Sequence, residues 1–144
     1  MEKIIIAVDL NEQTEEVVAL GMRLAKQLHA SVQLLTVIDR SLDFTITTEF
    51  HFDNQWEARL FVAKTELTKI KNQYPEVVTD VVTFIGNPKD DIIKESIEKQ
   101  ASFIVIGTHG RSAFVQFVMG GTAEFVVRHS TIPVVVLPYT KTEH

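Results

Sequence analysis

Glycines cluster between residues 107 and 121, and their spacing could build an anion-binding site. Gly107 is followed after two residues by Gly110, and after nine more by Gly120, with Gly121 directly behind it. Glycine lets a backbone approach a ligand closely. We expect Gly120, Gly121 and Thr122 to begin a helix. Their amides would then be unpaired, and the dipole of the helix would favour an anion at this end. The segment therefore predicts a phosphate cradle; glycines that only make turns are the alternative that spacing leaves open.

Other residues with chemical potential give weaker signals. His109 lies inside the glycine cluster and could contact a phosphate or transfer a proton. Glu49 and His51 have no third partner at metal-ligand spacing, which favours a surface loop. Asp90 and Asp91 fall in the first turn of an expected helix, where its dipole alone accounts for acidic residues. None of these predicts a catalytic or metal-binding residue by itself.

The common signatures of nucleotide-using and hydrolytic enzymes are absent. The sequence contains no Gly-x-Gly-x-x-Gly, no Gly-x-x-x-x-Gly-Lys-Ser/Thr and no Gly-x-Ser-x-Gly. It has no cysteine, which excludes disulfides, thiolate metal sites and a cysteine nucleophile. No positioned base or arginine finger can be named, so any ATP hydrolysis would be slow. The pattern favours binding over turnover.

Length and charge restrict the kind of protein. The chain has 144 residues and a formal net charge of −5. This length fits a single domain over residues 1–144. The acidic balance argues against nucleic acid and anionic membranes as partners, because both attract clustered Lys and Arg. The apolar stretch after Met1 is too short for a signal peptide or a membrane span, so we expect a cytoplasmic protein.

Five short apolar runs, separated by helical patterns, must position the glycine cluster. Three of them are rich in β-branched residues and show almost no polar alternation, as in strands covered on both faces of a parallel sheet. The runs are Ile4–Val8, Val32–Ile38, Val77–Phe84, Phe103–Ile106 and Val134–Leu137. Since helices alternate with them, the chain predicts a doubly wound α/β fold, whose ligands bind beyond the carboxyl ends of the strands.

The helical patterns are less sharply bounded than the strands. We expect a first helix capped by Asn11 or Thr14, a second from about Trp56 to Lys71, a third starting at Pro88 and a fourth near residues 121–129. Residues 40–54 carry several aromatic side chains without a clear period. This connection could cover a site or a partner, or fold onto the edge of its own domain.

The whole chain resembles the ATP-binding type of the universal stress protein family. The glycine spacing carries the resemblance, together with the opening Ile-Ile-Ile-Ala-Val-Asp, the Gly-Asn-Pro at residues 86–88 and the Arg-His-Ser that precedes the last strand. With strands numbered in chain order, the resemblance implies a parallel sheet of order 3-2-1-4-5, helices on both faces and a site between strands one and four. The ligand it implies is an adenine nucleotide, ATP or AMP.

The resemblance also assigns roles to individual residues. Asp9 would lie beside the nucleoside and could hold Mg²⁺ through bound phosphates, while the main chain of Val37 would read the adenine edge. The remaining nucleoside contacts would come from Ala7, Val8, Ile106 and Gly107. The phosphates would be surrounded by Gly110, Gly120, Gly121 and Thr122.

Two positions around the phosphates leave alternatives open. Arg111 could pair with a phosphate or remain solvated at the loop surface. The family usually has Ser or Thr where this chain has Gly121, so one hydroxyl contact is lost, unless Thr122 supplies it from a shifted angle. A hydrogen bond to a charged group contributes about 1.5–3 kcal/mol. We therefore expect nucleotide binding that is weakened but retained.

These assignments predict a nucleotide-responsive regulator in the stress response. The alternatives are an interaction protein of the same fold that no longer binds nucleotide, and a slow ATPase using His109 and Asp9. The fifth strand, Val134–Leu137, lies between two prolines and should form an edge of the sheet. Because the strand is apolar, its free edge would pair with another strand unless something covers it. The resemblance implies a homodimer through this edge; coverage by the C-terminal tail is the alternative.

Overall fold

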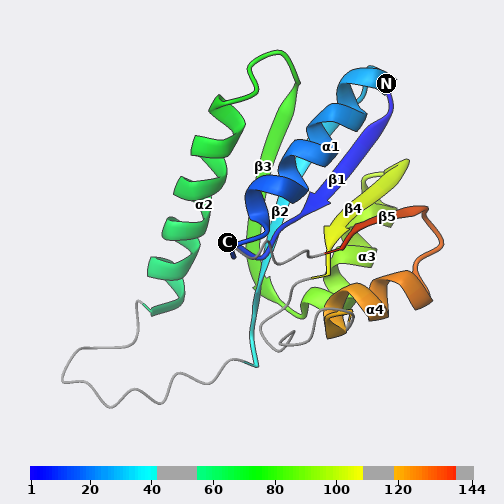
Figure 1. Ribbon diagram of the computed structural model, residues 1–144. Coiled ribbons are helices and arrows are strands. Elements are labelled where there is room, and N and C mark those ends of the chain that lie inside the picture. Colours follow the sequence, from blue (N-terminus) through cyan, green and yellow to red (C-terminus); the bar gives the residue numbers. More distant parts are fainter. Residues whose placement is uncertain (42–54, 109–118, 139–144) are drawn as a thin grey trace, which may run out of the picture.

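One parallel sheet organises the part of the chain that the computed structural model describes, residues 1–41, 55–108 and 119–138. Its five strands lie in the order β3-β2-β1-β4-β5, which confirms the predicted order and fold class (Figure 1). Their bounds are Lys3–Ala7 for β1, Ser31–Asp39 for β2, Thr79–Gly86 for β3, Phe103–Gly107 for β4 and Val134–Leu137 for β5.

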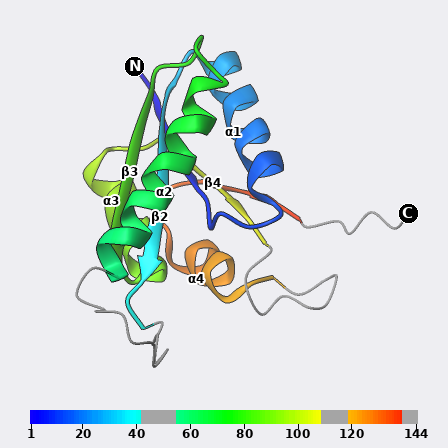
Figure 2. The ribbon, with the colours of Figure 1, turned by 90° about the vertical axis from the view of Figure 1, so that its left-hand side faces the viewer.

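Helices connect the strands and cover both faces of the sheet. Their bounds are Thr14–Leu28 for α1, Gln55–Asn72 for α2, Pro88–Glu98 for α3 and Gly121–His129 for α4. α1 and α2 pack on one face, and α3 and α4 pack on the other (Figures 1 and 2). No helix within the described residues has the length and apolar character needed to cross a membrane.

The central strand shows why the apolar runs lack alternation. Ile4 and Ile6 of β1 face the core under α1, where they join Met22, whereas Ile5 faces the opposite core with Ile92 of α3. Every one of these five side chains is buried. A strand that is covered on both faces needs no polar side. This is why the lack of polar alternation in the sequence predicted a parallel sheet.

Several boundaries differ from those predicted by one or two residues. β3 begins at Thr79 and not at Val77, because the Val77 amide donates to the Tyr74 carbonyl in the connection that follows α2, at 3.1 Å. α1 begins at Thr14 after a turn in which the Asn11 side-chain oxygen accepts from the Gln13 amide, at 2.9 Å. Neither predicted residue caps the helix, because the capping position is Gln13, whose side chain makes no cap hydrogen bond.

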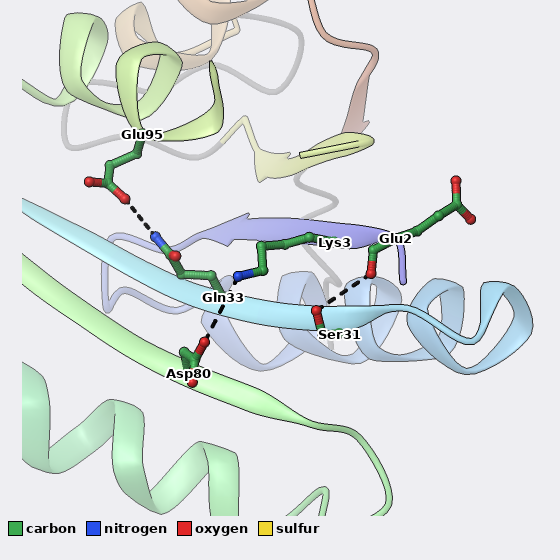
Figure 3. Close-up of polar contacts among 6 residues, drawn as sticks. All are labelled: Glu2, Lys3, Ser31, Gln33, Asp80 and Glu95. Atoms are coloured by element: carbon green, nitrogen blue, oxygen red, sulfur yellow. Dashed lines mark hydrogen bonds and ion pairs between the residues drawn. The ribbon is translucent and has the colours of Figure 1, made fainter. Parts of the chain in front are cut away.

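A buried polar contact anchors α3 to the sheet. Gln33 lies in the middle of β2 with its side chain almost completely buried, and its amide nitrogen donates to a carboxylate oxygen of Glu95 on α3, at 2.8 Å. Figure 3 shows this contact beside the weaker pair of Lys3 and Asp80, whose charged atoms are 3.9 Å apart. Since a buried amide without a partner is costly, this contact favours one position of α3 over β2.

Candidate functional site

A cavity of about 690 Å³ opens at the carboxyl ends of β1, β2 and β4. It lies at the point where strand order reverses, because β1 pairs with β2 on one side and with β4 on the other. Its volume is within the range of small-molecule sites, about 300–1,000 Å³. The wall also includes residues from α1, α2, α3 and the start of α4.

Every predicted site residue that the structure describes lines this cavity. These residues are Ala7, Val8, Asp9, Val37, Ile106, Gly107, Gly120, Gly121 and Thr122. Gly110, Arg111 and His109 lie outside the described residues, as does most of the connection over residues 40–54. The structure thus brings together, at one end of the sheet, residues that are more than 100 positions apart in the chain, such as Ala7 and Gly121.

The main chain of Val37 faces a gap beside β2. Odd residues of β2 direct their main-chain groups toward β1: Ser31 donates to Glu2, and Leu35 accepts from Val8. The next residue on that side is Val37, but β1 has already ended at Ala7. Within the described residues, no acceptor takes up the Val37 amide. This amide and its carbonyl therefore offer one donor and one acceptor to the cavity.

The hydroxyl of Thr36 takes part in the end of the strand pairing. It donates at 3.0 Å to the Val8 carbonyl, the same carbonyl that the Val37 amide would use if the strand pairing continued. The chain then turns away at Leu10, whose φ of 52° is left-handed. Such a conformation costs a non-glycine residue about 1–2 kcal/mol. Asp9, between Val8 and Leu10, is exposed at the cavity wall.

Gly107 is required by close packing at the end of β4. A β-carbon on this residue would overlap the side-chain oxygen of Gln13 and lie 2.8 Å from a methyl of Val17. The Gln13 side chain is buried and donates from its nitrogen to the Leu137 carbonyl, at 2.8 Å. The same carbonyl accepts from the Thr108 amide at 3.1 Å. The first glycine of the cluster thus lets Gln13 tie the start of α1 to the end of β5.

The start of α4 brings main-chain amides to the cavity wall. The expectation that all three leading amides are unpaired is wrong for Gly120, which donates to the Thr108 carbonyl at 2.9 Å. Glu124 makes the first bond of the helix, to the Gly120 carbonyl. The amides of Gly121, Thr122 and Ala123 come before that bond, and no side chain of the described residues caps them. These three donors are available to a ligand at this end of the cavity.

Several wall residues were not identified from the sequence. Lys89 is the second residue of α3, where the Asn-Pro pair indicated only a helix start, and α2 contributes Ala58, Arg59 and Val62. Gln13 and Thr36 give no local signal, because Gln13 bonds a residue 124 positions away and Thr36 one that is 28 away. Such contacts can be known only once the strands are placed side by side.

The chemistry of the wall suits binding. The apolar side chains of Val37, Ile92 and Ile106 belong to one cluster that also includes Ala123 of α4, and all of them line the cavity. The described part of the wall contains neither histidine nor cysteine. The described residues include no group of three or more side chains that could hold a metal ion. The arrangement fits a flat molecule with a hydrogen-bonding edge at one end and an anionic group at the other.

Comparison with known proteins gives consistent results along the whole chain. Residues 1–138 match the model of the universal stress protein family. Universal stress protein MJ0531 of Methanocaldococcus jannaschii is 28% identical over 148 residues, covering 99% of this chain and 85% of that protein. The structure of universal stress protein UspA from Lactobacillus plantarum has a TM-score of 0.82 at 20% identity, covering 94% of this chain and 97% of that one.

Two further structures of similar fold were solved with nucleotides. A universal stress protein in complex with cAMP has a TM-score of 0.71 at 15% identity, covering 96% of this chain and 98% of that one. The universal stress protein of Archaeoglobus fulgidus in complex with dAMP has a TM-score of 0.60 at 20% identity, covering 94% and 97%. At these identities the likeness concerns the fold.

Replacing Gly107 with alanine tests the packing at the end of β4. We expect Gly107→Ala to lower the free energy of unfolding by about 1–3 kcal/mol, because the new methyl group displaces Gln13. Urea denaturation measures the change. In a Gln13→Ala background the same substitution should cost less, since the overlapping amide is gone. An equal cost in both backgrounds would show that Gln13 is not the residue that excludes a side chain at position 107.

Proposed function

This chain belongs to the universal stress protein family, and we propose that it binds an adenine nucleotide, ATP or AMP, in the cavity at the ends of β1, β2 and β4. The observation that carries the proposal is the set of amides at Gly121, Thr122 and Ala123, for which the described residues provide no side-chain cap and which open onto a cavity lined by both apolar and polar side chains. Helix starts of this kind bind phosphate groups through their amides and dipole. The complexes of two similar folds with cAMP and dAMP support the same ligand class.

The base would bind at the opposite end, beside Val37. Adenine presents a ring-nitrogen acceptor next to an amino donor, and the amide and carbonyl of Val37 form the complementary pair. Apolar groups of Ala7 and Ile106 lie in the same wall and can contact the faces of the ring. Gly107 would pass close to the ribose, and Gly110 and Arg111 complete the proposed phosphate contacts. The ligand would span the cavity from β2 to α4.

The biological role that follows is regulation in a stress response. Nucleotide occupancy would change the state of a cytoplasmic homodimer, and partners would respond to that change. Slow hydrolysis of ATP is compatible with this role. An interaction protein without nucleotide is the competing function, and a flat calorimetric titration up to millimolar ATP would favour it.

Position 121 gives a matched pair of variants that tests the phosphate end. Among the described residues, a β-carbon there meets only the end of the Lys89 side chain, at 3.8 Å, so these neighbours leave room for serine or aspartate. We expect Gly121→Asp to weaken ATP binding about tenfold or more through repulsion, while its melting temperature stays equal or rises, since an acid favours a helix start. Gly121→Ser should bind ATP as well as the wild type or better. Isothermal titration calorimetry measures both, and equal affinities for the two variants would contradict the proposal.

Asp9 is proposed to hold Mg²⁺ through the bound phosphates. Mg²⁺ favours one or two carboxylates together with phosphate oxygens, and Asp9 is an exposed carboxylate of the cavity wall. We expect ATP to bind the wild type more tightly with Mg²⁺ than with EDTA, and this difference to shrink in Asp9→Asn. Equal affinity with and without Mg²⁺ in the wild type would argue against the role.

The proposed homodimer uses the outer edge of β5. Within the described residues β5 pairs only with β4, and its four residues are half-buried. An apolar edge of this kind is a site for pairing with a second strand. Sedimentation equilibrium at micromolar concentration should therefore give twice the mass of the chain. A monomer mass at that concentration would remove the dimer from the proposal and leave the cavity unaffected.

A further inference from the structure

Lys89 occupies a position that does not favour its charge. It follows Pro88 in the first turn of α3, where the Asn87 side chain caps the helix by accepting from the Lys89 amide, at 3.1 Å. The positive end of a helix dipole lies at this turn and disfavours a cation by about 0.3–1 kcal/mol. A lysine here is therefore not explained by the stability of its own helix.

The ammonium of Lys89 lies next to the start of α4. It is 3.9 Å from the point where a β-carbon on Gly121 would stand, and the preceding carbon of the side chain is 3.8 Å from that point. Both residues line the cavity. Across residues 1–41, 55–108 and 119–138, no carboxylate lies within 4.0 Å of this ammonium. Its charge is thus directed at the site and is not neutralised by a described neighbour.

The backbone beneath Lys89 is held firmly. A carboxylate oxygen of Asp91 accepts from the Asn87 amide at 2.8 Å, and it fills the space where a side chain on Gly86 would stand. Further along the helix, Glu95 receives the hydrogen bond from the buried Gln33. These contacts fix the first turn of α3 relative to the sheet, so the long side chain of Lys89 starts from a defined place beside the cavity.

We propose that Lys89 binds the phosphate chain together with the α4 amides, and that it makes the site select ligands by phosphate charge. This inference rests on the proposed nucleotide function. The ammonium stands beside position 121 at the start of α4, so an anion held by the α4 amides would receive a second contact from α3. The attraction between the ammonium and its partner grows with the negative charge of the partner. Lys89 therefore favours the binding of ATP and AMP over that of an uncharged nucleoside.

Lys89→Met tests this role, because methionine keeps the length and apolar stem of the side chain but removes the charge. Lys99→Met is the matched control: it removes the same charge at the other end of α3, at an exposed residue outside the cavity wall. Calorimetry with ATP, and with adenosine directly or in competition with ATP, gives the affinities. Thermal melting without ligand confirms that both variants are folded.

The expected result is an ATP dissociation constant at least about tenfold higher in Lys89→Met, with adenosine binding unchanged and Lys99→Met like the wild type. Raising the salt concentration should also weaken ATP binding less steeply in Lys89→Met. Unchanged ATP affinity in Lys89→Met, or an equal loss for ATP and adenosine, overturns the role of Lys89 and leaves nucleotide binding intact. If the wild type binds neither ligand, the proposed function itself fails.

Discussion

The site depends on one mismatch in the sheet: β1 stops pairing with β2 before β2 ends. Val8 donates the last main-chain bond to Leu35, and the hydroxyl of Thr36 then takes the Val8 carbonyl. Successive residues of a strand direct their main-chain amides and carbonyls to alternate sides. The amide and carbonyl of Val37 therefore face the space beyond the end of β1. Leu10 accepts a left-handed conformation to lead the chain away from that space. A continuous β1 would pair with Val37 and close the cavity.

The other end of the cavity has a different physical character. There, two helices begin close together, and the described residues provide no side-chain cap for the first amides of α4. α4 cannot satisfy these donors from within itself, so their partners must come from outside the helix. The tie between Gln13 and Leu137 holds the nearby strand ends, and the contact between Gln33 and Glu95 holds α3. The main-chain groups of Val37 and the first amides of α4 are thus kept at fixed places on one sheet.

Much of this arrangement could be predicted from the sequence, and the exceptions share a cause. The apolar runs predicted the strands, because a strand buried on both faces, such as residues 4–6, consists of consecutive apolar residues that stand out in the sequence. The glycine spacing revealed the start of α4. The use of the Gly120 amide by Thr108, the role of Thr36 and the position of Lys89 beside Gly121 were not predicted. Each depends on contacts between strands or helices that are distant in sequence, which no local pattern encodes.

The central claim is that main-chain groups at the two ends of the cavity hold one nucleotide. An ATP titration followed by amide resonances in ¹⁵N-labelled protein tests it most directly, because it reports on those groups themselves. The account predicts that the amides of Val37, Gly121, Thr122 and Ala123 shift together, with one common affinity, while those of the distant end of β3 near Thr79 stay in place. Shifts confined to other parts of the chain, or separate affinities for β2 and α4, would contradict it.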